Sequence, residues 1–189
     1  MKANTPFFSL ILGTLNRSKE IKILLDSLKK QTLDSFELIV IDQSDNDDTL
    51  EIIESKEYGI INIIYKKANI RGLSNARNIA LSYASGQYCC LVDDDASYDQ
   101  NYLLTAYKFL INHKKCILSA YMWNPLKKRS LCDINKLKNN KRLTIRKILR
   151  AAPSPGLIFP KVLFDQGIAF DPLLGVGSSF GACEETDAI

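Results

Sequence analysis

The stretch that decides the fold is residues 87–95, "QYCCLVDDD", in which an apolar run ends directly in three aspartates. A short, continuous apolar run of this kind is typical of a buried strand. Adjacent like charges repel, so Asp93, Asp94 and Asp95 need a compensating charge. Mg²⁺ or Mn²⁺ would supply it, since these ions take carboxylate oxygens together with phosphates and water. The alternative is a solvated strand–helix turn in which Asp95 or Ser97 caps the next helix.

Strand-like and helix-like patterns alternate along the rest of the chain. Runs typical of buried strands occupy 7–15, 36–42, 59–67, 87–92 and 116–123. Helical patterns separate them at 18–32, 46–57, 72–86 and 98–113. Ser18 is a candidate N-cap of the first helix, and Gly86 a candidate end of the third. The alternation predicts a single α/β domain over residues 1–189, with a doubly wound, mostly parallel sheet flanked by helices.

The predicted sheet brings polar stretches to one edge. In open α/β sheets, ligands bind beyond the carboxyl ends of the strands. We therefore expect Thr14–Arg17, Asp42–Ser44 and Asp93–Asp95 to lie together there. Arg71 precedes the third helix and Arg77 falls in its second turn, where guanidinium groups would neutralise a diphosphate. The alternative for Arg77 is an ordinary surface position on the helix.

A second acidic group follows a stretch of small residues, "GVGSSFGACEETDAI" (175–189). The small residues give a flexible entry to Glu184, Glu185 and Asp187. A carboxylate from this group could act as general base on an incoming hydroxyl if it reaches the strand ends. The alternative is an acidic helix start with no chemical role.

Charge and cysteine content restrict the class of partner. The net charge is +4, yet residues 127–150 alone hold ten Lys and Arg against one Asp, so the remainder is acidic. The basic segment suits a membrane surface with anionic headgroups, a solvated face or a nucleic-acid patch. It has no aromatic residues to stack on bases, so we expect no nucleic-acid partner. Five cysteines without a C-x-x-C pair, beside a single histidine, indicate reduced, buried thiols in the cytosol rather than a zinc site.

Four stretches, in order and spacing, carry a family resemblance. They are "LILGTLNR" (10–17), "SLKKQTLDSFELIVIDQSDND" (27–47), "ANIRGLSNARNIALSYASGQYCCLVDDDA" (68–96) and "GVGSSFGACEETD" (175–187). Together they resemble family 2 glycosyltransferases of the GT-A fold. The match is dense over 7–99, thin over 101–170 and present again over 171–188.

The resemblance implies a role for each matching residue. The acidic triplet resembles the family's Asp-x-Asp motif, which implies Mg²⁺ or Mn²⁺ held by Asp93 and Asp95, with Asp95 as the direct ligand. Glu185 matches the family's catalytic base, and its neighbours Glu184 and Asp187 are the fallback candidates. The residues implied in binding the nucleotide sugar are Thr14, Asn16, Arg17, Asp42, Gln43, Arg77, Asp93 and Asp94.

The resemblance also implies an activity. The expected enzyme moves a sugar from a UDP- or dTDP-sugar to a hydroxyl of a saccharide or lipid-linked acceptor, with inversion, in cell-surface polysaccharide or glycolipid synthesis. We expect it in the cytoplasm, with peripheral membrane contact through 127–150. The nucleotide-sugar half is about 6–100, and the acceptor side is about 101–189.

Two departures from the family pattern leave alternatives open. Gln43 stands where many relatives have a second acid, and the chain stops four residues after Glu185 where relatives continue. The second departure fits a truncated chain, and a catalytically inactive nucleotide-sugar-binding remnant is therefore an alternative. A nucleotidyltransferase ranks lower, because the first strand is not followed by a basic, glycine-rich phosphate loop.

Overall fold

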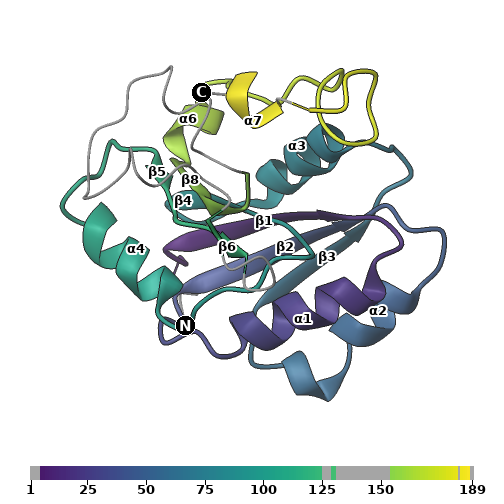
Figure 1. Cartoon of the computed structure of the whole chain (residues 1–189), viewed down its shortest axis with the longest axis horizontal. Helices are drawn as coiled ribbons and strands as arrows, with labels where there is room; N and C mark the ends of the chain where they lie inside the picture. The colour runs from purple at the N-terminus through teal and green to yellow at the C-terminus, as the bar shows by residue number, and fades with distance from the viewer. Residues whose placement is uncertain (1–4, 125–128, 131–153, 183, 188–189) are drawn as a thin grey trace.

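A six-stranded sheet runs through the computed structural model, which describes residues 5–124, 129–130, 154–182 and 184–187 (Figure 1). Its strands are β1 (Phe8–Thr14), β2 (Phe36–Asp42), β3 (Ile63–Lys67), β4 (Tyr88–Val92), β5 (Leu118–Ser119) and β8 (Leu157–Pro160). They lie in the order β3-β2-β1-β4-β8-β5. A separate two-stranded ladder pairs β6 (Trp123–Asn124) with β7 (Arg129–Ser130).

Helices cover both faces of the sheet. They are α1 (Ser18–Leu28), α2 (Asp48–Ile53), α3 (Leu73–Tyr83), α4 (Tyr102–Leu110), α6 (Val162–Asp165) and α7 (Glu184–Asp187), with 3-10 turns η1 (Lys56–Tyr58) and η3 (Ser154–Gly156). Helices α1 and α2 lie on one side of the sheet and α3 on the other (Figure 1). None of the helices in the described ranges has the length and apolarity that a bilayer-spanning helix requires.

The predicted mostly parallel sheet is confirmed, with one element that was missed. β1 pairs in parallel with β2 and with β4, and β2 pairs in parallel with β3. The missed strand, β8, runs antiparallel to β4 and to β5. The strand predicted over 116–123 was too long. Only β5 joins the sheet, and the residues after it continue into the β6–β7 ladder.

Alternation along the strands divides the core in two. Leu10 and Leu12 of β1 face α1 and α4, whereas Ile11 between them faces α3. The apolar face expected of α1 is buried as its periodicity predicts. This double burial explains why the strands show continuous apolar runs rather than alternation with polar residues.

The helices are shorter than predicted, and the cap positions expected from the sequence were wrong; the N-cap of α4, for example, is Asn101 rather than Asp95 or Ser97. Ser18 is not the N-cap of α1; that position is Arg17, which makes no side-chain capping bond. Helix α3 ends at Tyr83, with extended backbone at Ala84, so Gly86 lies beyond the helix. Gly86 is required for a different reason, which is close packing against β1.

Gly86 lies where the turn before β4 presses on the start of β1. Its N–H donates to Ser9 Oγ at 2.8 Å, and Ser9 Oγ donates to the buried Glu37 at 2.6 Å. Glu37 also accepts from Ser85 N at 2.8 Å. A Cβ built on Gly86 would lie 2.7 Å from the backbone N of Ser9, which leaves no room for a side chain.

We expect Gly86→Ala to lower the free energy of unfolding by about 1–3 kcal/mol, because the methyl group must displace the β1 backbone. Urea unfolding followed by circular dichroism measures the change. Gly59→Ala is the matched control, since Gly59 has a φ of −60° and its Cβ would meet its nearest neighbour at 3.6 Å. If the two variants have the same free energy of unfolding, the turn at Gly86 accommodates a methyl group without loss of stability, which would contradict the prediction.

Candidate active site

The three strand ends that the sequence placed on one edge do meet there. The registers pair Thr14 with Asp42, and Leu12 with Val92, so Asp93 follows β4 directly at the same edge. The backbone N–H of Gln43 donates to Thr14 O at 2.9 Å. Asn16 N–H donates to Ser44 Oγ at 2.7 Å, which joins the loop after β1 to the loop after β2.

Each aspartate after β4 has a different environment. Asp94 is buried and accepts from Thr14 Oγ1 at 2.8 Å. Arg17 forms ion pairs with both Asp94 and Asp95, each at 2.9 Å. The Asp95 side chain is 57% exposed, whereas that of Asp93 is 30% exposed and lies 3.5 Å from Arg77. Arginine side chains therefore offset part of the repulsion within the triplet.

Asp42 is fully buried behind the edge. Its carboxylate accepts from Ser44 N at 2.9 Å and from Tyr65 Oη at 2.8 Å, and Lys67 Nζ lies 3.5 Å away. Burial, and then the hydrogen bond to Asp42, raise the pKa of Tyr65. Sequence reasoning missed Tyr65 and Lys67. The signal was available, because two-residue spacing puts both on one face of the strand predicted over 59–67.

The loop before α3 is fastened to the loop after β2. The Gln43 side-chain amide donates to the carbonyls of Ile70 and Gly72, the latter at 3.1 Å. Arg71 donates to the Gln43 carbonyl and forms an ion pair with Asp45. Both amide N–H groups of Gln43 are thus committed to the protein backbone, which leaves Oε1 as its free functional group.

Arg77 has no exposed surface, so the alternative of a surface position is wrong. Its Nη1 donates to Glu184 Oε1 at 2.9 Å, and its Nη2 lies 3.5 Å from Asp93 Oδ1 and also contacts Ser154 Oγ. The guanidinium lies 5.5 Å from the centre of the Phe170 ring. Ser154 and Phe170 were not anticipated, because they reach Arg77 from 77 or more residues away in sequence.

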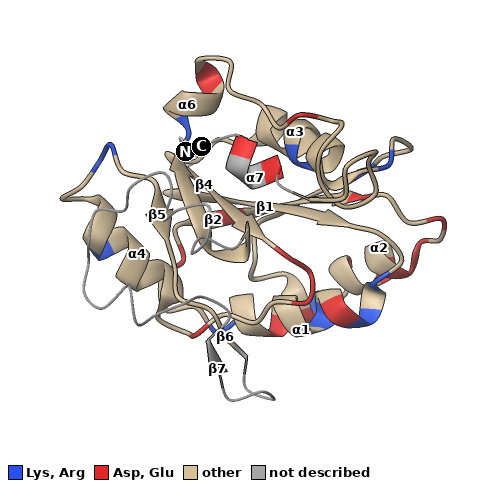
Figure 2. Cartoon of the chain, turned by 45° about the horizontal axis from the view of Figure 1, so that its top comes forward, with Lys and Arg blue, Asp and Glu red and all other residues tan. Residues whose placement is uncertain are grey.

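The C-terminal acids divide between a buried and an exposed environment. α7 carries them and lies beside α3 (Figure 2). Glu184 is 4% exposed and occupied by Arg77, whereas Asp187 is exposed. Glu185 belongs to α7, but its side chain falls outside the described part of the structure. The basic segment 127–150, apart from the backbone of β7, falls outside it as well.

The donor set suits a hard divalent cation. Asp93 and Asp95 offer carboxylate oxygens, which Mg²⁺ and Mn²⁺ prefer. Within the described ranges, however, no group of three or more His, Cys, Asp or Glu side chains forms a ready-made metal site. The residues present therefore fit an ion that completes its shell with phosphate oxygens and water.

Burial governs the protonation of the aspartates. It raises the pKa of Asp93 to about 6, although the nearby Arg77 works in the opposite direction. Burial also raises the pKa of Asp94, against the hydrogen bond from Thr14 and the charge of Arg17. The buried thiols of Cys89 and Cys90 have a pKa near 12 for the same reason, whereas Cys116 is exposed, contrary to the expectation of buried cysteines.

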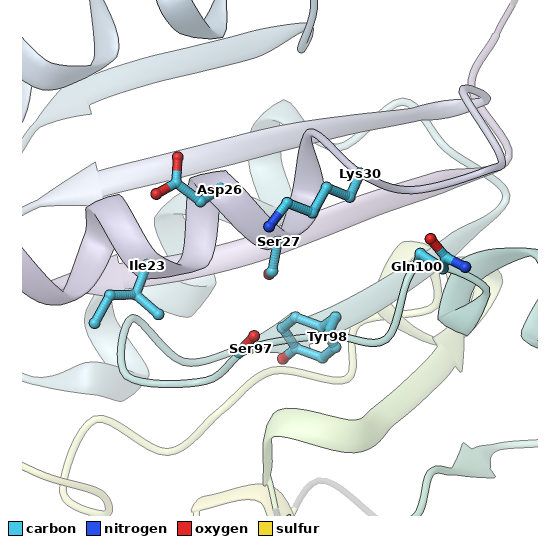
Figure 3. A pocket seen from close by; sticks show the side chains of 7 residues that line it. All are labelled: Ile23, Asp26, Ser27, Lys30, Ser97, Tyr98 and Gln100. Atoms are coloured by element: carbon cyan, nitrogen blue, oxygen red, sulfur yellow. The ribbon is translucent and has the colours of Figure 1, made fainter.

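A small cavity lies beside this edge but is not formed by its residues. It has a volume of about 240 Å³ and lies between α1 and the segment after the aspartates (Figure 3). Its lining residues are Ile23, Asp26, Ser27, Lys30, Ser97, Tyr98 and Gln100. None of the predicted site residues is among them.

The chain belongs to glycosyl transferase family 2, whose model matches residues 9–157. This match confirms the family resemblance and covers the first three motifs, whereas the fourth, at 175–187, lies beyond it. It defines the class of protein as a glycosyltransferase.

Particular relatives share the sequence over part of their length. A poly(ribitol-phosphate) beta-N-acetylglucosaminyltransferase, TarS, of Staphylococcus aureus is 33% identical over 118 residues, which are 61% of this chain and 21% of that protein. A PGL/p-HBAD biosynthesis glycosyltransferase of Mycobacterium bovis is 31% identical over 112 residues, 58% of this chain and 43% of that protein. The chain thus spans less than half the length of these curated relatives.

Solved structures agree with the fold. TarS residues 1–349 in complex with UDP match with a TM-score of 0.72 and 28% identity, over 87% of this chain and 50% of that one. A mannosyltransferase from Pyrobaculum calidifontis, in complex with GDP-Man and Mn²⁺, matches with a TM-score of 0.71 at 20% identity, over 94% of this chain and 51% of that one. The predicted GT-A fold is therefore confirmed.

The raised pKa of Asp93 gives a pH-dependent stability. Because Asp93 binds its proton more tightly in the folded protein than in the unfolded chain, protonation of Asp93 adds to the free energy of unfolding. This contribution is fully present below about pH 4 and is lost as the pH rises through about 6. Asp93→Asn has no charge to lose. We expect its free energy of unfolding, relative to the parent chain without metal, to increase between pH 4 and pH 6 and to stay level above pH 7. Urea titrations of both chains across this range test it, and a constant difference would contradict the assignment.

Proposed function

We propose that this chain transfers a sugar from a nucleoside-diphosphate sugar, with a UDP- or dTDP-sugar favoured, to an acceptor hydroxyl with inversion. The observation that carries the proposal is the meeting of Thr14, Asp42 and Asp93–Asp95 at one sheet edge in a family 2 chain. No observation favours the alternative of an inactive remnant or of a nucleotidyltransferase.

The base preference follows in part from Gln43. Its amide N–H groups are held by backbone carbonyls, so Oε1 can accept a hydrogen bond from a ring N–H. N3–H of uracil or thymine is such a donor, and so is N1–H of guanine, whereas N3 of cytosine is not; Gln43 therefore disfavours cytosine, and the preference over guanine rests on the relatives. Solved complexes of TarS contain UDP and UDP-GlcNAc, which supports a uracil nucleotide here. Asp42 accepts a hydrogen bond from the backbone N–H of Ser44 and so holds the loop that carries Gln43.

The diphosphate would lie over the aspartates after β4. Asp95 and Asp93 would hold Mg²⁺ or Mn²⁺, which when bound supplies charge neutralisation for the departing diphosphate. Arg17 lies on the same exposed side and can turn to phosphate oxygens. Asn16 adopts a left-handed backbone with φ of 55°, which directs the loop that carries Arg17. Thr14 fixes Asp94 and so orients the triplet.

Glu185 is the proposed general base. Its neighbour Glu184 is occupied by Arg77, so Glu184 is a poor candidate to receive a proton. Glu185 would remove the proton of the acceptor hydroxyl while that oxygen attacks the sugar and the nucleoside diphosphate leaves. A single displacement of this kind inverts the anomeric carbon and needs no covalent enzyme intermediate.

The acceptor side is proposed from chemistry and relatives. The named relatives act in poly(ribitol-phosphate) modification and PGL/p-HBAD biosynthesis, which supports a saccharide or lipid-linked acceptor in cell-surface polysaccharide or glycolipid synthesis. The basic segment 127–150 would then contact the anionic inner face of the membrane from the cytoplasm.

Calorimetric titration of UDP, dTDP and GDP, each with and without Mn²⁺, tests the donor site. We expect metal-dependent binding that prefers UDP or dTDP. In Asp95→Asn we expect at least a tenfold loss of UDP affinity with Mn²⁺ present, because a metal ligand is gone. Asp99→Asn, four residues further at an exposed position, should bind as the parent chain does. Unchanged Mn²⁺ dependence in Asp95→Asn would overturn the metal assignment.

Replacement of the proposed base should separate binding from transfer. We expect Glu185→Gln to reduce transfer from the preferred nucleotide sugar by roughly 10²-fold or more, because proton removal in the transition state is lost. UDP binding should persist in the same calorimetric assay. If Glu185→Gln keeps full transfer activity and Asp187→Asn loses it, the base is Asp187.

A further inference from the structure

We propose that Arg77 is a positioning residue that couples the metal site at Asp93 to helix α7, so that occupation of the donor site tightens α7 against α3. The inference rests on the proposed function, because it takes Asp93 as a metal ligand. It assigns to Arg77 no direct contact with the donor, since its guanidinium is fully buried.

Arg77 is shared between two carboxylates from distant parts of the chain. Glu184 Oε1 lies 2.9 Å from Nη1, and Asp93 Oδ1 lies 3.5 Å from Nη2. Without the guanidinium between them, the two carboxylates would repel each other at low exposure to solvent. The state of one carboxylate therefore affects how strongly Arg77 holds the other.

The segment that leads to α7 is hydrogen-bonded to α3 at Phe170, Leu174 and Val176. Hydrogen bonds join Asn78 to both backbone groups of Phe170 at 2.7 and 2.9 Å, Ser74 Oγ to Leu174 O at 2.7 Å, and Leu73 N to Val176 O at 2.9 Å. The Arg77–Glu184 ion pair continues this series at α7 itself. A Cβ on Gly175 would lie 3.0 Å from Glu184 Cδ, so the carboxyl group also packs on this loop.

The sign of the coupling follows from charge. A divalent cation at Asp93 offsets that carboxylate and repels the guanidinium, so Arg77 interacts more strongly with Glu184. By linkage, metal binding and the Arg77–Glu184 contact strengthen each other by the same factor. Occupation of the donor site would thus fix α7, and with it Glu185, before the acceptor hydroxyl reacts.

Mn²⁺ titration in the presence of UDP, monitored by electron paramagnetic resonance, tests the coupling. Two substitutions are expected to change the Mn²⁺ affinity in opposite directions. In Glu184→Gln, Arg77 loses its other carboxylate partner and interacts more strongly with Asp93, where it competes with Mn²⁺. We therefore expect the Mn²⁺ affinity to fall by roughly fivefold or more. In Arg77→Gln the competing cation is absent, and we expect the affinity to rise. Asp187→Asn removes an exposed acid from the same helix and should leave the affinity unchanged. Weaker Mn²⁺ binding in Arg77→Gln, in a chain shown to be folded, would overturn the proposal.

Limited chymotrypsin cleavage of the whole chain measures the order of the same segment. Leu173 and Phe180, both more than half exposed, are cleavage sites whose products mass spectrometry identifies. We expect Mn²⁺ with UDP to slow cleavage there several-fold in the parent chain and to have no effect in Arg77→Gln. Arg77→Lys, which keeps the charge, should retain part of the effect.

The two proposals fail in different ways. If the parent chain binds neither Mn²⁺ nor UDP, the proposed function is contradicted. Cleavage without ligand then still tests whether Arg77 holds α7 against α3. Equal ligand-free cleavage of Arg77→Gln and the parent chain would show that Arg77 does not hold α7. Should Arg77→Gln not fold, Glu184→Gln decides, because unchanged Mn²⁺ affinity in that variant contradicts the coupling.

Discussion

The parallel pairing of β1 with both β2 and β4 is the constraint on which the rest of the structure depends. Its register sets Thr14 beside Asp42 and delivers Asp93 one residue beyond the β4 pairing. β1 is apolar and buried on both faces, so a slip of one residue would exchange the two halves of the core. Hydrophobic burial therefore fixes the register, and the register sets the positions of the polar residues at the strand ends.

Much of this arrangement could be predicted from the sequence because it is local and periodic. "FELIVID" is bounded by polar residues, and β2 has the predicted ends, 36 and 42. Strand ends of a parallel sheet share an edge, so the meeting of Thr14, Asp42 and Asp93 required no knowledge of side-chain contacts. Arg17 could be placed at the same edge in this way, whereas its ion pairs with Asp94 and Asp95 could not be predicted.

The remainder could not be predicted because it arises from packing between distant segments. A helical pattern gives Arg77 a place on α3 but not the Phe170 ring and Glu184 that cover it, the latter 107 residues away. β8 has only four residues, too few for periodicity to separate a strand from a loop. Where α3 ends was likewise decided by the contact of the following turn with β1, which overrides the usual preference for glycine at helix ends.

The charges at the edge give a physical reason for the proposal that metal and diphosphate bind together. Arg17 forms ion pairs with both Asp94 and Asp95 and offsets part of their charge, and Arg77 lies 3.5 Å from Asp93. A divalent ion alone would have to displace these arginines, and the exchange of one cation for another brings little net gain. A diphosphate supplies the missing negative charge, because it ligates the ion and offers the displaced Arg17 a new partner. Two ligands that each relieve the cost of binding the other are thermodynamically coupled. The arginines that offset the charge of the aspartate triplet would therefore make the proposed donor site respond to the metal and the diphosphate as a pair.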